Sequence, residues 1–345
     1  MIDIYGTLGP SCSRQEILTQ MFRAGMTGVR LNLSHISLRQ SAGQLETLHA
    51  AAREAGVKPR LLIDMQGPEL RIGRFRAPVM LDEKEKVVLY SEKLEEADRL
   101  RLRRSVRAAV PIPGVVCQAL EKDREVLLDD GRILLRIRET GEGRAGAEVL
   151  RGGLLAARKS IKVPGLDIHM PTMTDADLEN IRDAAAFGVT GIIQPCVRSR
   201  EDLEEVRAAL DRSGAGDLRL VAKIENREGM SRLDSLLPVC DAICIARGDL
   251  GNDMELWDLP AAQKQIAAAC KKAGRYFMVA TQMLASMEKN AVPTRAEVND
   301  IFNTVADGAS GVMITGESAV GAHPVEAIRF LANTAASAEL FRSGS

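Results

Sequence analysis

Short apolar runs alternate with longer amphipathic segments along most of the chain. Several runs are hydrophobic almost throughout, which is typical of parallel strands that are covered on both faces. Polar pairs mark two helix starts, Thr172 or Thr174 with Asp177 in the first and Thr294 with Glu297 in the second. The predicted strands are residues 2–7, 28–33, 60–64, 189–194, 218–223, 242–246, 276–280 and 311–314. Eight strand–helix units predict an α/β fold, a TIM (β/α)8 barrel.

The alternation stops between about residues 73 and 155, where Val, Ile and Leu runs follow one another at hairpin spacing. Asp129-Asp130-Gly131 is a turn signal, and residues 126–128 and 133–137 have a strand-like composition. This pattern predicts a small all-β domain inserted after the third barrel strand, where it would act as a lid that excludes water. The predicted division is barrel 1–72, inserted domain 73–156 and barrel 157–345.

Composition and charge exclude several functions. The chain has a formal net charge of −1 and only 3% aromatic residues, so it lacks the basic field and stacking side chains of a nucleic-acid binder. No apolar run approaches the ~20 residues of a membrane span, and no basic targeting segment is visible. The six cysteines are scattered without a C-x-x-C pair, which favours reduced thiols in a cytoplasmic protein.

Three charged residues stand at the ends of two predicted strands. Lys223 and Glu225 come at the end of the run 218–222, and Asp249 follows the run 242–246. Side chains alternate along an extended strand, so Lys223 and Glu225 point to the same side. Two carboxylates suit a hard ion such as Mg²⁺, and an ammonium beside them can neutralise a transferring phosphoryl group or deliver a proton. Each residue alone fits a solvated charge, whereas the three together favour a catalytic site.

The predicted barrel gives these and other polar residues one location. TIM barrels hold their chemistry at the carboxyl ends of the strands. The strand-end residues are Arg30, Asn32, Asp64, Lys223, Glu225, Asp249, Thr281, Thr315 and Glu317. We therefore expect them to line one mouth of the barrel.

Ten ordered motifs resemble those of the pyruvate kinase family, from Thr7 to about Leu340. They include Thr7-Leu8-Gly9-Pro10-Ser11, Asp64-Met65-Gln66-Gly67-Pro68, Ala246-Arg247-Gly248-Asp249 and Thr315-Gly316-Glu317-Ser318, with others at 29–35, 129–131, 163–165, 223–226, 280–284 and 293–297. The order and spacing of the motifs, with an insertion between the third and fourth strands, make the resemblance specific.

The resemblance implies a role for each matching residue. Glu225 and Asp249 would hold Mg²⁺ or Mn²⁺, and Lys223 would stabilise the transferring phosphoryl group electrostatically. Thr281 is similar to the residue near the methylene carbon that is protonated, and the amides of Gly248 and Asp249 would cradle the substrate carboxylate.

Further residues are assigned by the same resemblance. Arg30 and Arg71 would bracket phosphate oxygens, a task for which a forked guanidinium is better suited than a lysine. The implied K⁺ site consists of Asn32, Ser34, Asp64 and the backbone carbonyl of Met65. The implied nucleotide-binding residues are Pro10, Asn32, His35, Arg71 and Lys159.

Several positions depart from the family pattern. Gln66 stands where the family usually has a lysine, and Pro195-Cys196 replaces a Ser-Phe pair. Asp3 stands where lysine is usual, and residues 158–162 also differ. The family's carboxyl-terminal domain has no counterpart in the sequence, so we expect no sugar-phosphate effector response and either a monomer or a homodimer.

Three functional hypotheses follow from the sequence. The leading one is transfer of phosphoryl between phosphoenolpyruvate, or a close analogue, and a nucleoside diphosphate (ADP or another), with Mg²⁺ and K⁺. The second is a divergent paralogue that uses the same metal-enolate site on another 2-oxo acid. The third, a non-catalytic binding module, is disfavoured because such a module has little physical reason to hold an ammonium against two carboxylates.

Overall fold

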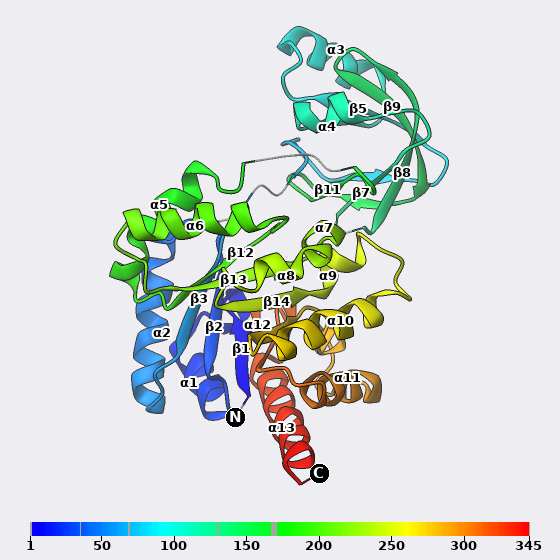
Figure 1. The fold of residues 1–345 in the computed structure, drawn as a ribbon. Coiled ribbons are helices and arrows are strands. Elements are labelled where there is room, and N and C mark those ends of the chain that lie inside the picture. The colour runs from blue at the N-terminus through cyan, green and yellow to red at the C-terminus, as the bar shows by residue number, and fades with distance from the viewer. Residues whose placement is uncertain (1, 35, 68–69, 130, 167–170, 345) are drawn as a thin grey trace. The chain divides into compact units, whose positions relative to one another are not determined.

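The protein was analysed as a computed structural model that describes residues 2–34, 36–67, 70–129, 131–166 and 171–344 (Figure 1). The chain forms two compact units, one made of Met1–Pro68 with Pro171–Ser345 and the other of Glu69–Met170. The first unit contains the predicted barrel. None of the helices in the described ranges is long and apolar enough to cross a membrane.

Eight parallel strands close into a barrel in the order β1-β16-β15-β14-β13-β12-β3-β2. Their bounds are β1 Asp3–Thr7, β2 Gly28–Asn32, β3 Arg60–Asp64, β12 Gly191–Gln194, β13 Arg219–Ile224, β14 Ala242–Ala246, β15 Tyr276–Ala280 and β16 Gly311–Met313. Each corresponds to one predicted strand, and the TIM barrel prediction is confirmed.

Helices follow the strands around the barrel (Figure 1). They are α1 Gln15–Arg23, α2 Ala42–Ala55, α5 Asp175–Asp183, α6 Arg200–Arg212, α7 Arg227–Ser231, α8 Leu233–Leu236, α9 Arg247–Gly251, α10 Leu259–Lys272, α11 Arg295–Ala306, α12 Gly316–Ala319 and α13 Pro324–Ser343. Short 3₁₀ helices span Pro10–Cys12, Arg39–Ser41, Ala184–Phe187 and Ala285–Glu288. The capping boxes at Thr174 and Thr294 are both formed, so Thr174, and not Thr172, caps α5.

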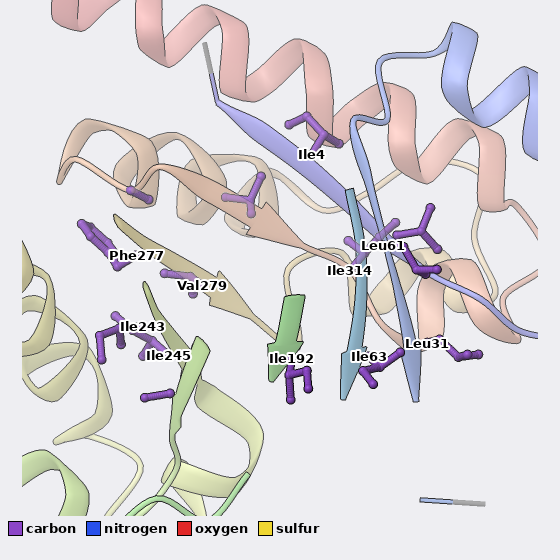
Figure 2. Packing of buried hydrophobic residues seen from close by; sticks show 14 of the residues in the cluster. Ile4, Leu31, Leu61, Ile63, Ile192, Ile243, Ile245, Phe277, Val279 and Ile314 are labelled. Atoms are coloured by element: carbon purple, nitrogen blue, oxygen red, sulfur yellow. The ribbon is translucent and has the colours of Figure 1, made fainter. Parts of the chain in front are cut away.

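Side chains of the barrel strands alternate between two hydrophobic clusters. Leu61 and Ile63 of β3 belong to the large cluster outside the strands (Figure 2). Leu62, between them, belongs to a smaller cluster inside the barrel. On β13, Val221 lies in the inner cluster while Ile224 packs outside. Lys223, two residues after Val221, therefore points to the inner side of the barrel at the carboxyl end of its strand.

Asp3, one of the departures from the family pattern, finds partners at the amino end of the barrel. Its carboxylate forms an ion pair with Arg60 and accepts a hydrogen bond of 2.8 Å from the hydroxyl of Tyr276. A negative charge at this position is thus compensated by residues of β3 and β15. Asp3 begins β1 and therefore lies at the end of the barrel opposite the predicted mouth.

The second unit is built around a six-stranded sheet of order β11-β7-β8-β9-β5-β6 and a pair β10-β4. The strands are β4 Val79–Leu81, β5 Lys86–Ser91, β6 Ala109–Ile112, β7 Glu125–Leu128, β8 Ile133–Gly141, β9 Arg144–Arg151, β10 Gly153–Leu155 and β11 Ile161–Lys162. Two helices, α3 Glu96–Ser105 and α4 Gly114–Ala119, accompany them, so the unit is not purely β.

The unit also extends beyond the expected 73–156, because flanking apolar residues belong to its core. Ile72, Ile161 and Val163 are buried in the hydrophobic cluster of this unit, and Leu70 packs against it. Turn signals could not predict these core contacts. Such signals mark the hairpins of a domain, whereas these residues lie in the segments that connect the domain to the barrel sequence.

Candidate active site at the carboxyl ends of the barrel strands

A cavity of about 940 Å³ opens at the carboxyl ends of the barrel strands. Its volume lies within the range of small-molecule sites, roughly 300–1,000 Å³. The predicted site residues that line it are Pro10, Arg30, Asn32, Asp64, Lys223, Asp249, Thr281 and Thr315. All of them belong to the barrel unit and come from seven segments that are distant in sequence.

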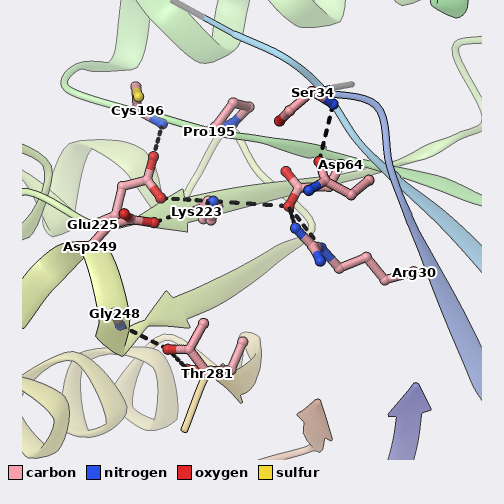
Figure 3. Close-up of polar contacts among 12 residues, drawn as sticks. Arg30, Ser34, Asp64, Pro195, Cys196, Lys223, Glu225, Gly248, Asp249 and Thr281 are labelled. Atoms are coloured by element: carbon pink, nitrogen blue, oxygen red, sulfur yellow. Dashed lines mark hydrogen bonds and ion pairs between the residues drawn. The ribbon is translucent and has the colours of Figure 1, made fainter. Parts of the chain in front are cut away.

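The Lys223 ammonium is surrounded by three carboxylates. Its Nζ lies 2.9 Å from Glu225 Oε2, 3.7 Å from Asp249 Oδ2 and 3.9 Å from Asp64 Oδ2 (Figure 3). Lys223 and Asp64 are largely buried, whereas the Asp249 side chain is about half exposed. The alternation on β13 and the adjacency of β13 and β14 bring these groups together.

This environment holds Lys223 in its charged form. Burial alone would lower the pKa of the ammonium, but the attraction of Asp64, Glu225 and Asp249 outweighs it and raises the pKa well above its usual value. Lys223 is therefore positively charged over the physiological pH range. It is suited to stabilise an anion, and it would act as a proton acceptor only if its carboxylate partners were neutralised.

Arg30 is oriented by Asp64. Its Nε and Nη2 donate to Asp64 Oδ2 at 2.8 and 2.6 Å, and Nη1 lies 3.4 Å from Thr7 Oγ1. β2 and β3 are adjacent strands, and Arg30 and Asp64 both stand near their carboxyl ends. Asp64 thus fixes a guanidinium and contacts an ammonium with the same oxygen, which places two cations at one side of the cavity.

Glu225 is held by the segment that follows β12. The Cys196 amide donates to Glu225 Oε1 at 2.6 Å, and the Cys196 backbone has a left-handed φ of 54° (Figure 3). Burial, followed by repulsion from Glu225, raises the pKa of the Cys196 thiol well above its usual value. The neutral thiol is therefore a neighbour of the carboxylates and adds no further negative charge to them.

The segments that carry the altered positions approach each other at Gly67 and Pro195. Gly67 follows Gln66 with a φ of 58°, and a Cβ atom on Gly67 would lie 2.4 Å from Pro195 Cγ. β3 and β12 are neighbouring strands, so the segments after them meet. Glycine is required at position 67 because of both the backbone angle and this close approach.

Thr281 occupies a strained backbone conformation at the end of β15. Its φ is 72°, which is unusual for a β-branched residue. Its hydroxyl donates to Ala280 O at 2.6 Å and accepts from Gly248 N at 2.7 Å. Arg247 donates from Nε and Nη2 to Thr281 O at 3.2 and 2.9 Å, and its Nη1 pairs with Asp300 at 2.6 Å.

A family model described as pyruvate kinase, barrel domain, matches residues 1–328. The chain belongs to the pyruvate kinase family. Proteins named pyruvate kinase match it at 37% identity in Methylorubrum extorquens, 33% in Chlamydia pneumoniae and 32% in Sporosarcina psychrophila. The matches cover 94%, 94% and 96% of this chain but 66%, 66% and 56% of the relatives. The chain therefore spans between about half and two thirds of the length of these relatives.

The remaining residues predicted from the pyruvate kinase resemblance are placed as follows. Asn32 Oδ1 accepts from Ser34 N at 3.1 Å, next to Asp64 at the ends of β2 and β3. Met65 is buried, and its amide donates to Ile193 O at 3.1 Å. His35 lies outside the described residues.

Arg71 and Lys159 belong to the second unit and bond within it. Arg71 Nη1 donates to Arg158 O at 2.8 Å, and Lys159 Nζ pairs with Asp129 Oδ1 at 2.6 Å. Residues 71 and 160 form an isolated antiparallel bridge. The roles of Arg71 and Lys159 toward a phosphate or nucleotide stay predictions.

Two residues that hold segments next to the candidate site are not assigned from the sequence. Asp177 is buried, and its carboxylate accepts from the amides of Gln66 and Gly67 at 2.8 and 3.0 Å. It was interpreted only as the partner of Thr174 in the capping box, which is also formed. Arg247 was visible only as part of a motif. Periodicity gives no signal for such contacts because they join segments far apart in sequence.

Proposed function

We propose that this chain transfers a phosphoryl group between phosphoenolpyruvate, or a close analogue, and a nucleoside diphosphate, using Mg²⁺ or Mn²⁺ and K⁺. The observation that carries the proposal is the Lys223 ammonium held among three carboxylates, with Arg30 fixed on the same Asp64. This arrangement offers cations to phosphate oxygens and carboxylates to a metal. Family membership supports the same chemistry.

The carboxylates fit a divalent metal. Glu225 Oε2 is buried and accepts no hydrogen bond from a described residue, although Lys223 Nζ lies 2.9 Å away. No group of three histidine, cysteine or acidic residues in the described ranges could hold a metal by itself. Glu225 and Asp249 would therefore supply two ligands to an ion that keeps positions for water and substrate oxygens, as Mg²⁺ usually does. Bound there, Mg²⁺ would neutralise charge on the substrate and polarise its oxygens.

The K⁺ proposal has a separate physical basis. Asp64 Oδ1 is buried and accepts no hydrogen bond from a described residue, while Oδ2 carries both the Arg30 and the Lys223 contacts. An unsatisfied buried carboxylate oxygen is costly, and a bound cation would satisfy it. Asn32 and Ser34 stand beside Asp64 and offer further oxygen ligands.

The chain's own residues would divide the work of transfer. Arg30 and Lys223 would orient the phosphoryl group and stabilise its negative charge in transit. The Thr281 hydroxyl, which donates to Ala280 O and accepts from Gly248 N, would lie near the methylene carbon and belong to the proton path. The amide of Gly248 would exchange its bond to Thr281 for one to the substrate carboxylate, so substrate binding and the Thr281 hydroxyl would be coupled.

A second candidate is a divergent paralogue that acts on another 2-oxo acid. The observation that favours it is the close approach of Gly67 and Pro195, which brings the two altered segments together next to Glu225. The deciding experiment is a coupled assay of phosphoenolpyruvate with ADP and other nucleoside diphosphates in Mg²⁺ and K⁺, repeated with a panel of 2-oxo acids. If only another 2-oxo acid is turned over, the divergent paralogue replaces the first proposal. If the protein binds Mg²⁺ but turns over no substrate, only the binding-module hypothesis remains.

A further inference from the structure

The backbone turns sharply just after β15, where two consecutive residues have left-handed φ angles. Thr281 has a φ of 72° and Gln282 a φ of 55°. Neither residue is a glycine, and Thr281 is β-branched, so this conformation is disfavoured on local grounds. We name residues 281–284 the Thr281 turn. Contacts with other segments must hold the turn in place, because its own sequence does not favour it.

Arg247, the first residue of α9, holds the turn at its first carbonyl group. Its Nε and Nη2 donate to Thr281 O at 3.2 and 2.9 Å, and Nη2 also lies 2.9 Å from Met283 Sδ. These contacts are possible because α9 follows β14, which is the neighbour of β15 in the barrel. The Arg247 side chain is only 10% exposed, so a largely buried cation fixes the backbone of the turn.

Asp300 of α11 compensates the charge of this cation. Its Oδ2 lies 2.6 Å from Arg247 Nη1, and in the described ranges no other carboxylate is ion-paired with Arg247. The Asp300 side chain is 36% exposed, so it stands at the surface. A buried charge without a counterion is costly. Loss of the Asp300 charge therefore draws the guanidinium toward water and away from Thr281 O.

A different group holds the far end of the Thr281 turn. The amide of Leu284 donates to Glu317 Oε1 at 3.0 Å, and the amide of Thr315 donates to Oε2 of the same carboxylate at 2.7 Å. Glu317 is fully buried. Only the first end of the turn, which carries Thr281, therefore depends on an ion pair that reaches the surface.

We propose that Asp300 and Arg247 are positioning residues for the Thr281 hydroxyl. The contacts lead from Asp300 through Arg247 to Thr281 O, and Thr281 Oγ1 in turn accepts from Gly248 N at 2.7 Å. Thr281 lines the candidate active-site cavity, whereas Asp300 and Arg247 do not. They set the position of the hydroxyl without touching the substrate. This inference rests on the proposed function, in which Thr281 belongs to the proton path.

The kinetic test compares the parent with Asp300→Asn, which removes the charge and keeps the size of the side chain. The kcat of phosphoryl transfer and the rate of Mg²⁺-dependent deuterium exchange at the methyl group of pyruvate should each fall about tenfold to a hundredfold, because a misplacement of about 1 Å can cost 10²-fold. The KM for phosphoenolpyruvate and the Mg²⁺ affinity should stay within about threefold, since Arg30, Lys223 and Glu225 keep their contacts. Asp300→Glu, which retains a carboxylate, should lie closer to the parent.

Asp307→Asn is the matched control. Asp307 follows the last residue of α11, and its carboxylate pairs with Lys264 of α10 at 2.8 Å with a side-chain exposure of 28%. The control therefore loses a similar ion pair at the same helix without any contact to Arg247, and it should behave as the parent does. Equal falls in Asp300→Asn and Asp307→Asn would indicate a general loosening of α11 and would overturn the proposal.

Amide hydrogen exchange tests the same contacts without any turnover. The amide of Gly248 bonds to Thr281 Oγ1, so it should exchange about tenfold faster or more in Asp300→Asn and at the parent rate in Asp307→Asn, as measured by peptide mass spectrometry. Faster exchange in a protein whose parent form shows no turnover would reject the proposed function and still support the positioning contacts. Exchange of Gly248 at the parent rate in Asp300→Asn, or an unchanged kcat in that variant of an active parent, would overturn the proposal.

Discussion

The backbone amide of Cys196 donates a 2.6 Å hydrogen bond to Oε1 of Glu225. Through this bond, the segment after β12 orients a carboxylate that is carried by β13, the neighbouring strand. The bond requires a left-handed backbone at Cys196, with a φ of 54°, and uses no side-chain atom of that residue. The Pro195-Cys196 pair therefore acts on Glu225 through the Cys196 backbone.

The first prediction separates the Cys196 backbone from its thiol. Cys196→Gly keeps the amide and adopts a positive φ without strain, so Glu225 should remain oriented and Mg²⁺ affinity should stay within about threefold of the parent. Titration calorimetry with Mg²⁺ measures this. A loss of Mg²⁺ affinity of more than about tenfold would mean that the thiol itself contributes to the metal site. The raised pKa of Cys196 argues against this, because a thiol binds metal as the thiolate.

The second prediction concerns the two carboxylates proposed to hold the divalent metal. Glu225→Gln and Asp249→Asn each remove a charged ligand while keeping the size of the side chain, and each should weaken Mg²⁺ binding by at least about tenfold. Glu204→Gln, an exposed carboxylate paired with Arg200 on α6, is the control and should bind as the parent does. Calorimetric curves that coincide for parent and both site variants would show that the assignment is wrong.

The third prediction concerns the monovalent cation. K⁺ should raise the rate of phosphoryl transfer, and Asp64→Asn should abolish the K⁺ response, because its buried Oδ1 is the unsatisfied oxygen beside Asn32 and Ser34. In the resembling family, a glutamate at the position of Glu69 accompanies dependence on K⁺; Glu69 lies outside the described residues. The measurement compares turnover in K⁺ and in tetramethylammonium at matched ionic strength, and equal rates would contradict the prediction.

Much of the barrel could be predicted from the sequence because its signals are local. Strands β3, β14 and β15 match the predicted runs residue for residue, since each is a short apolar segment between helical patterns. The convergence of Lys223 with Glu225 follows from strand alternation, and the approach of Asp249 follows from parallel pairing. These two relationships needed no knowledge of packing between helices or loops.

Other features could not be predicted, because they depend on contacts between distant segments. The amides of Gln66 and Gly67 bond to Asp177, more than a hundred residues away, and no periodicity indicates that pairing. The left-handed backbone of Thr281 could not be predicted either, because β-branched residues rarely adopt a positive φ. Hydrogen bonds from Arg247 and Gly248 hold Thr281 in this conformation. Helices α3 and α4 in the second unit were missed because turn signals dominated that region.

The fourth prediction is a pH dependence of stability centred on Asp202. Burial would raise the pKa of this carboxyl, but the guanidinium and amide of Arg198 and the hydroxyl of Thr172 outweigh burial and lower it. A lowered pKa in the folded state gives stability that is present above the unfolded pKa, about 3.9, and is lost as pH falls through the folded value.

Asp202→Asn should therefore cost about 1–3 kcal/mol in free energy of unfolding at pH 7, and the difference from the parent should shrink below about pH 4. Urea denaturation between pH 3 and 8 measures both. Glu204→Gln, two residues along α6 on the exposed side, should change the free energy by less than about 0.5 kcal/mol. A parent–variant difference that is constant down to pH 3 would contradict the assignment of Asp202 as the titrating group.

The last prediction decides between the two enzyme hypotheses at the altered mouth. Gln66 is held by its backbone amide, which donates to Asp177 Oδ1 at 2.8 Å, so its side chain can be replaced without disturbing the segment. In the proposed transfer, the neutral side chain would leave the phosphoryl group with one stabilising charge fewer than the lysine usual in the family, a loss that commonly costs on the order of 10²-fold in rate. The parent should therefore show weak transfer between phosphoenolpyruvate and ADP.

Gln66→Lys should raise that transfer rate, whereas Gln66→Met, of similar size and without charge, should not. Lys223→Met should cut transfer severely, because it removes the ammonium that three carboxylates hold in place. Mg²⁺-dependent enolisation of pyruvate, followed as deuterium exchange at the methyl group, should persist in the parent and in Gln66→Lys, since it needs the metal carboxylates and no phosphoryl acceptor. If neither transfer nor exchange occurs while another 2-oxo acid is turned over, the kinase hypothesis fails and the divergent paralogue replaces it.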